Sequence, residues 1–274
     1  MITIDTKALV DFTKRLIKTP SPSGEEASIA RAVADEMKKI GFDQVLTDEL
    51  HNVLGVLEGR GGGRDLLLLA HTDHVDVGQM PDPFSGKEID GEPFDESGPV
   101  IYGRGACDMK GALASMVYAV EMVKRRSAEL AGNVYVLAFT REEKGEGEGL
   151  DHAAENWDLK ADMAISGEAT GLDVYIGHRG SMQFKIVAKG RSCHASDPSR
   201  GVNAIYQMTQ ILERLRSSYR MPRHPTMGQA TFTVLGIRSE PEGETPIVPD
   251  HCEILVDRRY FPEETREGIE AELV

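Results

Sequence analysis

Two kinds of hydrophobic pattern alternate along the first 180 residues and predict a mixed α/β fold. Apolar residues recur at helical spacing over residues 23–40 and again from Met109 onward, which predicts two amphipathic helices. Continuous apolar runs over residues 65–70 and 134–139 predict strands that are covered on both faces. Because such runs alternate with helices, we expect this part of the chain to form an α/β domain.

Local signals within this region predict finer features. Ser23 and Glu26 stand three residues apart at the start of the first predicted helix, and this spacing is typical of a capping box. The apolar stretches 51–57 and 65–70 flank a glycine-rich turn, which predicts a β-hairpin. Residues 77–107 are rich in proline, glycine and aspartate and show no period, so we expect a long loop that lines a functional site.

The pattern changes after residue 180 and predicts a second domain. Its predicted order is β-α-β-β-α, with elements at residues 182–188, 203–216, 231–237, 252–259 and from 263. A ferredoxin-like unit has one more strand after this order. We therefore expect two domains, residues 1–180 and residues 181–274, with the last strand of the second domain missing from this sequence.

Composition restricts the classes of partner. The 274 residues are 40% hydrophobic, and 45 acidic against 31 basic residues give a formal net charge of -14. This acidic balance argues against nucleic acid and against an anionic membrane surface, so a small-molecule substrate is favoured. No apolar run approaches the roughly 18 residues of a membrane span, and the first residues lack the pattern of a secretory signal, so we expect a cytoplasmic protein. Cys107, Cys193 and Cys252 match neither a disulfide framework nor a zinc knuckle and are expected to be free thiols.

Acidic and imidazole side chains stand where the apolar runs end. They are His71 with Asp73, Asp108, Glu142 with Glu143, and Glu168. Strand ends of this kind meet at the mouth of an α/β sheet, where ligands usually bind. Together these side chains are typical of the ligand set of a metal hydrolase.

Each member of this set also has an ordinary structural explanation. The pattern His-x-Asp after a strand is weak alone, and Asp108 is also typical of a carboxylate at a helix N-terminus. Glu142 and Glu143 are also typical of an exposed acidic loop, and Glu168 of a surface residue. The metal prediction therefore depends on the whole group and not on any one residue.

The spacing within two pairs favours the metal interpretation. Residues two apart in an extended segment face the same side, so Asp73 is placed to accept a hydrogen bond from one ring nitrogen of His71 while the other binds metal. Glu142 and Glu143 would repel each other if both were buried without a cation. Divalent ions relieve this repulsion, with one carboxylate binding metal while its neighbour takes a proton from water.

The motifs in this order resemble a known enzyme family over essentially the whole chain. The matching segments are His71-Thr72-Asp73, Gly103-Arg104-Gly105 with Asp108-Met109-Lys110-Gly111, Glu142-Glu143, and Ser166-Gly167-Glu168. They resemble the zinc-dependent family of acetylornithine deacetylase, succinyl-diaminopimelate desuccinylase, aminoacylase and glutamate carboxypeptidase. The implied fold is a zinc-exopeptidase-like catalytic domain with a mixed sheet (residues 1–180) and a ferredoxin-like α+β lid (residues 181–274).

The resemblance implies a pair of zinc ions, with cobalt or manganese as alternatives. Its ligands would be His71, Asp108 and Glu168 on one ion and Asp108 with Glu143 on the other. Glu142 would act as the general base, Asp73 would orient His71, and a cis peptide bond is expected at Asp108–Met109. The family takes a last histidine ligand from a C-terminal segment after the lid, so we expect the catalytic domain to be incomplete in this sequence.

The resemblance also assigns residues in the second domain. His194 matches a lid histidine that stabilises the oxyanion, and Arg259 matches an arginine that binds the substrate carboxylate, a group that suits the guanidinium fork. Arg258 is expected on the opposite face of the same strand. The lid is also expected to form a homodimer.

Hydrolysis of an N-acyl amino acid is the leading functional hypothesis, because family members with glutamate at the position of Glu168 tend to be deacylases or carboxypeptidases. The alternatives are a carboxypeptidase or dipeptidase of the same family that acts on short peptides, and a truncated relative that acts only in binding or dimerisation. An NAD enzyme and a serine hydrolase are disfavoured, because their glycine-rich and Gly-x-Ser-x-Gly motifs are missing.

Overall fold

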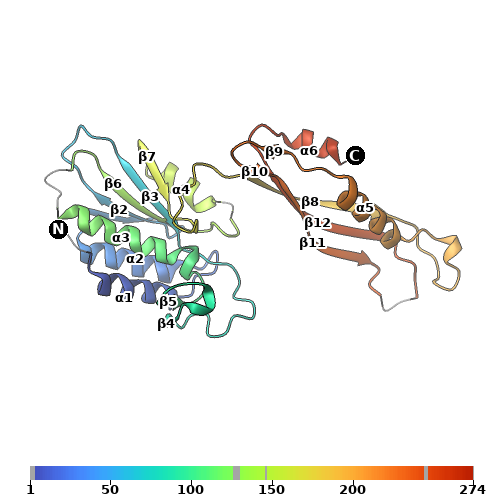
Figure 1. Ribbon diagram of the computed structural model, residues 1–274, viewed down its shortest axis with the longest axis horizontal. Coiled ribbons are helices and arrows are strands. Elements are labelled where there is room, and N and C mark those ends of the chain that lie inside the picture. The colour runs from blue at the N-terminus through green and yellow to red at the C-terminus, as the bar shows by residue number, and fades with distance from the viewer. Residues whose placement is uncertain (1–3, 126–129, 146, 244–245, 274) are drawn as a thin grey trace. The chain divides into compact units, whose positions relative to one another are not determined.

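The computed structural model describes residues 4–125, 130–145, 147–243 and 246–273. The chain divides into two compact units, residues 1–172 and residues 173–274. The predicted α/β class is confirmed, since helices and a mixed sheet make up the first unit and an antiparallel sheet with helices makes up the second (Figure 1).

The first unit is built on a five-stranded sheet in the order β1-β2-β6-β3-β7. Its strands are β1 (Gln44–Thr47), β2 (Val53–Leu57), β6 (Val134–Phe139), β3 (Leu66–His71) and β7 (Met163–Ser166). The three strands β6, β3 and β7 are parallel, whereas β1 and β2 pair antiparallel and β2 pairs antiparallel with β6. Three adjacent strands therefore end at the same edge of the sheet.

Helices cover the two faces of this sheet unequally. The helices α1 (Thr6–Ile17), α2 (Ala27–Ile40) and α3 (Gly111–Lys124) lie together on one face, as Figure 1 shows. Their apolar side chains and those of the strands form the largest buried cluster of the molecule. The helix α4 (Glu148–Asn156) contributes to a smaller cluster with β2 and β6 on the other face.

The predicted hairpin between residues 51–57 and 65–70 is wrong. The strands β2 and β3 are not neighbours, because β6 lies between them and pairs with both. The run that forms β6 is apolar at almost every position and nearly all of it is buried, so it takes the central place in the sheet. The glycine-rich turn between the two apolar runs predicted direct pairing of β2 with β3, but a third strand, β6, separates them in the sheet.

The predicted capping box at the start of α2 is also wrong. Glu26 occupies the N-cap position, but its side chain makes no hydrogen bond to the helix. Ser23 instead donates to Asp73, with 2.5 Å between Oγ and Oδ2. A buried charged acceptor forms a stronger hydrogen bond than a neutral one, and it outcompetes the local helix partner. The helix ends at Gly41 in a left-handed conformation with φ of 88°, as is typical of a glycine C-cap.

The segment predicted as a long loop, residues 77–107, contains a small hairpin. Its strands are β4 (Lys87–Asp90) and β5 (Pro99–Tyr102), joined through a short turn of helix, η1 (Glu92–Phe94). A tight turn, η2 (Ala106–Lys110), then leads into α3. The peptide bond Asp108–Met109 within this turn is cis, as expected from the motif resemblance.

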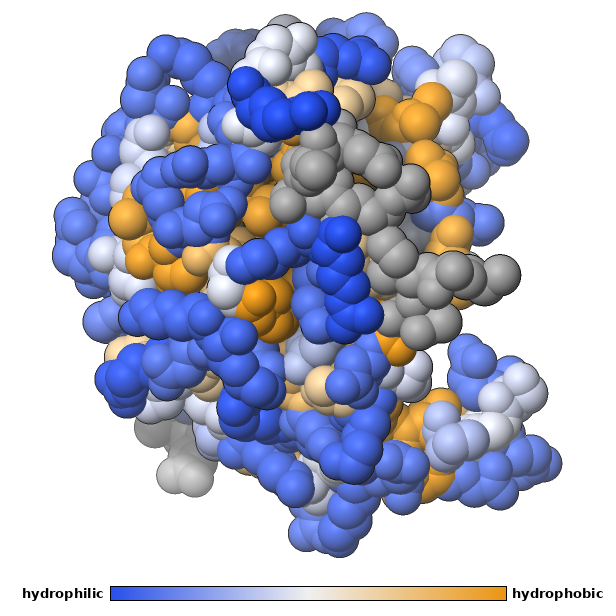
Figure 2. All heavy atoms as spheres, turned by 90° about the vertical axis from the view of Figure 1, so that its left-hand side faces the viewer, coloured by the Kyte–Doolittle hydropathy of each residue, from blue (hydrophilic) through white to orange (hydrophobic). Residues whose placement is uncertain are grey.

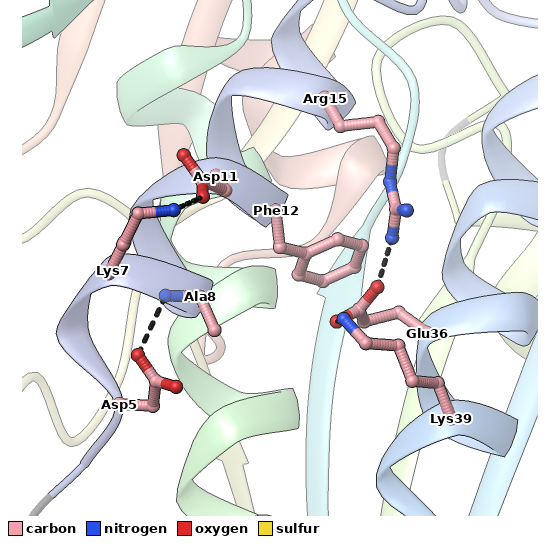
Figure 3. Close-up of a pocket in the computed structure, with 8 residues that line it drawn as sticks. All are labelled: Asp5, Lys7, Ala8, Asp11, Phe12, Arg15, Glu36 and Lys39. Atoms are coloured by element: carbon pink, nitrogen blue, oxygen red, sulfur yellow. Dashed lines mark hydrogen bonds and ion pairs between the residues drawn. The ribbon is translucent and has the colours of Figure 1, made fainter.

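A buried carboxylate connects the three helices on the main face. Glu36 of α2 forms an ion pair with Arg15 of α1 and a hydrogen bond of 2.6 Å with the hydroxyl of Tyr118 in α3. Lys39 lies 2.8 Å from the same carboxylate. Burial alone would raise the pKa of Glu36, but the bonds to Lys39, Tyr118 and Arg15 outweigh it and lower this pKa. Figure 3 shows Arg15 and Lys39 meeting at Glu36.

The second unit contains a three-stranded antiparallel sheet in the order β11-β12-β8. Its elements are β8 (Gly180–Lys189), η4 (Pro198–Arg200), α5 (Ala204–Ser218), β9 (Arg223–His224), β10 (Gly228–Gln229), β11 (Thr231–Glu240), β12 (His251–Tyr260) and α6 (Arg266–Glu272). The main elements follow the predicted β-α-β-β-α order. The helix α5 packs its apolar side against alternate residues of β8 and β12 to form a core of its own.

On the face shown in Figure 2, hydrophilic side chains predominate and hydrophobic residues occur in scattered patches. Within the described part of the chain, no helix is long and apolar enough to cross a bilayer.

The two adjacent arginines of β12 face opposite sides of the sheet, as strand alternation predicts. Arg258 is completely buried and forms an ion pair with Glu264, and its Nε lies 3.3 Å from the hydroxyl of Tyr219. Arg259 is exposed and pairs with Asp257 at 2.9 Å. The buried arginine therefore links β12 to the end of α5 and to the segment before α6.

Replacement of Arg258 by alanine is expected to lower the free energy of unfolding by about 3 kcal/mol, because Glu264 would keep a poorly solvated charge without its partner. Chemical denaturation followed by circular dichroism measures this value. Arg259→Ala is the matched control and is expected to cost less than about 1 kcal/mol, since its pair is exposed. Equal losses in both variants would contradict the structural role of Arg258.

Candidate metal centre

The predicted ligands lie where three parallel strands end side by side. His71 is the last residue of β3 and stands opposite Phe139 at the end of β6. On the other side, Leu69 of β3 stands opposite Ser166, the last residue of β7. Glu142 and Glu143 follow β6 and Glu168 follows β7, so all of them emerge at the same edge of the sheet.

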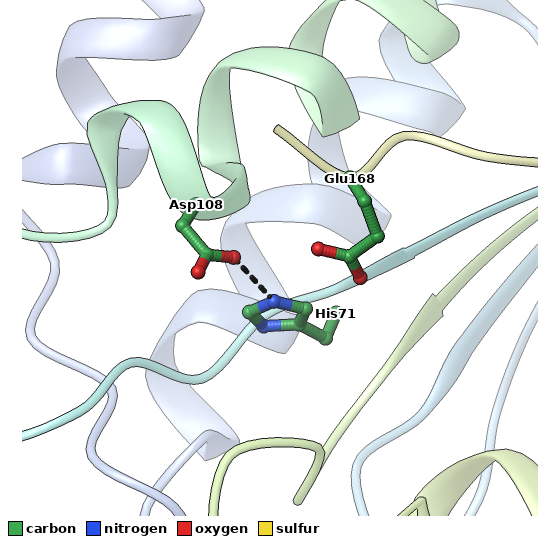
Figure 4. A group of neighbouring side chains, drawn as sticks. All are labelled: His71, Asp108 and Glu168. Carbon is green, nitrogen blue, oxygen red and sulfur yellow. Dashed lines mark hydrogen bonds and ion pairs between the residues drawn. The ribbon is translucent and has the colours of Figure 1, made fainter. Parts of the chain in front are cut away.

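Asp108 reaches this edge from a different direction. It lies in the turn η2, before α3, and its Oδ1 is 2.8 Å from Nε2 of His71. One ligand atom each from His71, Asp108 and Glu168 can be chosen so that all three lie within 4.8 Å of one another. Figure 4 shows the three side chains pointing toward a common point. The imidazole is buried and both carboxylates are exposed, so the group opens toward solvent.

The electrostatics of the group favour positive charge. Burial acts to lower the pKa of His71, but hydrogen bonds and charges from Asp108 and Asp73 outweigh burial and raise it to about 10. The hydrogen bond from His71 lowers the pKa of Asp108. A proton on the imidazole thus compensates the surrounding carboxylates near neutral pH.

These residues fit a divalent metal ion. An imidazole nitrogen with two carboxylate oxygens is a donor set that suits zinc and related divalent ions. Three protein ligands leave a coordination position open, which is the arrangement of catalytic rather than structural sites. The metal would replace the proton that His71 otherwise carries.

Asp73 is a completely buried carboxylate that connects this group to its surroundings. Its Oδ1 lies 3.4 Å from Nδ1 of His71 and accepts a hydrogen bond of 3.1 Å from the backbone N–H of Glu142. Its Oδ2 accepts from the N–H of Glu143 at 3.1 Å and from the hydroxyl of Ser23. Burial acts to raise the pKa of Asp73, but these donors lower it to about 2.

The ring of His71 is oriented by two oxygens of the same residue. Its Nδ1 lies 3.1 Å from the backbone carbonyl oxygen of Asp73, closer than the carboxylate at 3.4 Å. Asp73 therefore contacts the ring through both its main chain and its side chain, and its role in orienting a metal-bound His71 stays a prediction. Both contacts leave Nε2 directed toward Asp108.

Glu142 and Glu143 are placed through their backbone. Both are partly buried, and both N–H groups point at Asp73. Burial and the charge of Asp108 raise the pKa of Glu143, which shows that this carboxylate lies in the field of the group. The group of ligand atoms that lie within 4.8 Å of one another comes from His71, Asp108 and Glu168 and does not include Glu143. The predicted metal contact of Glu143 therefore stays a prediction.

Gly167 allows Glu168 to reach the site. A Cβ on this residue would lie 2.8 Å from Cβ of Ala112, 2.9 Å from Cε of Met116 and 3.0 Å from Cε of Met109. The N–H of Gly167 bonds to the carbonyl of Leu69 at 3.1 Å and continues the pairing of β3 with β7. The chain therefore passes close to α3 at this point.

The two predicted residues of the second unit lie on its exposed surface. His194 is exposed, with Nδ1 2.7 Å from the hydroxyl of Ser196, and its backbone forms a bridge with Ile247. Arg259 is exposed on β12. Their roles toward a substrate stay predictions.

Three residues near the site were not identified as functional from the sequence. Ser23 and Glu26 were interpreted as a helix cap, although their partners lie in segments that follow β3 and β6. Lys110 is completely buried and its ammonium donates to the carbonyl of Thr19 at 2.9 Å, which fixes the turn that carries Asp108. Burial lowers the pKa of Lys110 to about 8. A lysine two residues after a site aspartate was the signal available in the sequence for this residue.

Comparison with known proteins gives the class to which the fold and site belong. The family model for peptidase family M28 matches residues 52–214, which is more than half of the chain. The family model for the peptidase dimerisation domain matches residues 176–274. The chain is therefore a member of the metallopeptidase class.

Individual relatives define the family more narrowly. The chain is 34% identical over 263 residues to the uncharacterized protein YgeY of Escherichia coli, with 94% of this chain and 62% of YgeY covered. It is 29% identical to succinyl-diaminopimelate desuccinylase of Wigglesworthia glossinidia brevipalpis, with 97% and 72% covered. The YXEP protein of Bacillus subtilis, a dinuclear metal-binding peptidase of family M20, has the same fold with a TM-score of 0.69 at 18% identity, over 97% of this chain and 67% of that one.

The chain matches the models of peptidase family M28 and of the peptidase dimerisation domain, and its relatives include succinyl-diaminopimelate desuccinylase, in agreement with the resemblance of its motifs. It spans 62% of the length of YgeY.

Replacement of Gly167 by alanine is expected to weaken zinc binding by about tenfold or more, because the added methyl group would displace Glu168 from His71 and Asp108. Competition with a chromophoric chelator measures the affinity. Gly236→Ala is the matched control, since a Cβ there meets no atom within 4 Å. A second substitution, Ala112→Gly, would remove the nearest of these atoms, which is fixed to the helix backbone, and is expected to restore part of the binding. Unchanged zinc affinity in the single variant would contradict the role assigned to Gly167.

Proposed function

We propose that this chain carries the metal site of a hydrolase that cleaves the amide bond of an N-acyl amino acid. The observation that carries the proposal is the group His71, Asp108 and Glu168, whose ligand atoms lie within 4.8 Å of one another at the ends of parallel strands. Family membership supports the same class of reaction, since the relatives include a desuccinylase and a deformylase that act on acyl–nitrogen bonds by their names.

We assign the metal ligands by the motif resemblance and the donor set. His71, Asp108 and Glu168 would hold one ion, and Asp108 with Glu143 would hold a second. Zinc is the expected metal, with cobalt or manganese as alternatives. When bound, these ions would supply Lewis acidity, lowering the pKa of a water molecule and polarising the carbonyl of the scissile amide.

The remaining steps belong to the side chains of the protein. Glu142 acts as general base: one of its carboxylate oxygens takes a proton from the attacking water and later passes it to the nitrogen of the leaving amine. Asp73 supports this role because it fixes the backbone N–H of Glu142. The buried ring of His71 cannot take over proton transfer while Nε2 is engaged as a ligand.

The second unit would supply substrate contacts and dimerisation. The guanidinium of Arg259 suits a substrate carboxylate, because a planar fork of N–H donors matches two carboxylate oxygens. His194 would donate a hydrogen bond to the developing oxyanion. The match to a peptidase dimerisation domain supports a homodimer formed through this unit.

A peptidase is the second candidate for the same site. The glutamate at position 168 favours a deacylase or carboxypeptidase over a dipeptidase, according to the family trend. The related Bacillus subtilis structure is described as a peptidase, which keeps short peptides as alternative substrates. A truncated relative that acts only in binding or dimerisation would not bind a catalytic metal. It would also not hydrolyse N-acyl amino acids or short peptides.

Glu142→Ala is expected to lower kcat for N-acetyl and N-succinyl amino acids by about 10²–10⁴, because the general base is lost. Bound metal per chain, measured by inductively coupled plasma mass spectrometry, is expected to stay at the wild-type value. Lys144→Ala is the control, since its side chain is exposed two residues further along the chain.

Three results would separate the candidates. Turnover of N-acyl amino acids above dipeptides supports the deacylase, and the reverse preference supports the peptidase. A zinc-loaded wild-type chain without turnover of either class would contradict the enzyme proposal.

A further inference from the structure

The carboxylate of Glu26 acts outside the helix that it begins. Glu26 is 1% exposed and precedes α2, yet it makes no side-chain bond to the helix. Its Oε1 instead accepts two hydrogen bonds of 3.0 Å, from the backbone N–H of Arg141 and from that of Gly24. A buried carboxylate is costly unless such donors surround it, so this position serves a contact 115 residues away in the chain.

Arg141 turns the chain directly before the two glutamates that we assign to catalysis. Its φ of 57° lies in the left-handed region, which residues other than glycine rarely adopt. Its N–H points at Glu26, and the next two N–H groups, those of Glu142 and Glu143, point at Asp73. Two buried carboxylates therefore hold three consecutive backbone groups after β6.

The segment that supplies Glu26 is itself anchored beside the metal ligand His71. The hydroxyl of Ser21 donates to the carbonyl of Thr72 at 2.7 Å, and its N–H donates to Nε2 of His74 at 3.1 Å. The hydroxyl of Ser23 then donates to Asp73 at 2.5 Å. Residues 21–26 therefore bind both the segment after β3 and the segment after β6.

We propose that Glu26, together with Ser23, is a positioning residue for Glu142 and Glu143. The inference rests on the proposed roles of these two glutamates. Glu26 holds the N–H of Arg141, and Ser23 holds the carboxylate of Asp73 that binds the following two N–H groups. These contacts set the direction in which the side chains of residues 142 and 143 leave the backbone.

The contacts predict a local effect rather than general unfolding. Glu26 contacts the segment after β6, whereas β6 keeps its own ladders with β2 and β3 and its buried apolar side chains. Removal of the carboxylate would free the N–H of Arg141, loosen the backbone that leads to Glu142 and Glu143, and leave His71, Asp108 and Glu168 in place. Substrate affinity would not change, because Glu26 contacts no residue assigned to substrate binding.

The test compares Glu26→Ala with Glu26→Gln and with the exposed neighbour Glu25→Ala in the full zinc-loaded chain. Glu26→Ala is expected to lower kcat for an N-acyl amino acid by about 10–100-fold with KM unchanged, because a misplaced base reduces only the chemical step. Glutamine keeps an oxygen that accepts both N–H groups, so it is expected to restore most of kcat. Glu25→Ala is expected to match the wild type.

Hydrogen exchange measured by mass spectrometry on the metal-free proteins gives a readout that is independent of activity. Faster exchange in Glu26→Ala is expected at residues 141–143, with β6 unchanged. If Glu26→Ala does not fold, Ser23→Ala takes its place and is expected to change the same amides and to lower kcat by a smaller factor. Wild-type exchange at residues 141–143 in a folded variant would overturn the inference.

The two proposals fail in different ways. A wild-type chain that binds zinc but hydrolyses neither N-acyl amino acids nor dipeptides would contradict the proposed function. The exchange comparison would still decide whether Glu26 holds residues 141–143. Loss of exchange protection throughout the first unit, including β6, would overturn the positioning role by showing that Glu26 supports the fold as a whole.

Discussion

The site depends on the hydrogen bonds made by the buried carboxylate of Asp73. It follows β3 and accepts hydrogen bonds from Ser23, Glu142 and Glu143, while it contacts the ring of His71. A carboxylate with no exposed surface is stable only when donors of this kind replace water. Because its folded pKa of about 2 is below the usual value, its charge stabilises the fold above pH ~4, and this contribution is lost as the pH falls through the folded value.

The mixed sheet explains why distant parts of the sequence meet at this point. The strands β6, β3 and β7 are adjacent and parallel, so the residues that follow them share one edge. Asp108 joins them because a tight turn with a cis peptide bond precedes α3. On the helical side, Glu36 connects α1, α2 and α3 through charged and hydroxyl partners, and this network supports the face from which Asp108 approaches.

The sequence predicted the strand ends well and the contacts between them poorly. Apolar runs that stop at His71, before Glu142 and before Glu168 are local signals, and the structure places these strands where the runs occur. The hairpin was wrong because the position of β6 between β2 and β3 depends on pairing partners far apart in the chain. The capping box was wrong for the same reason, since Ser23 binds a residue 50 positions away. The helix α1 was missed although Asp5 caps it and Phe12 and Leu16 lie on its buried side.

The most direct test is the zinc affinity of Asp73→Asn, measured by chelator competition against the wild type. An amide places an N–H₂ group where donors already point, so the variant is expected to bind zinc about 10–100-fold more weakly while it keeps its fold. Asp76→Asn is the matched control, because Asp76 is exposed and accepts a hydrogen bond from the nearby N–H of Gly78. Wild-type zinc affinity in a folded Asp73→Asn protein would contradict the account, since the site would then not depend on this carboxylate.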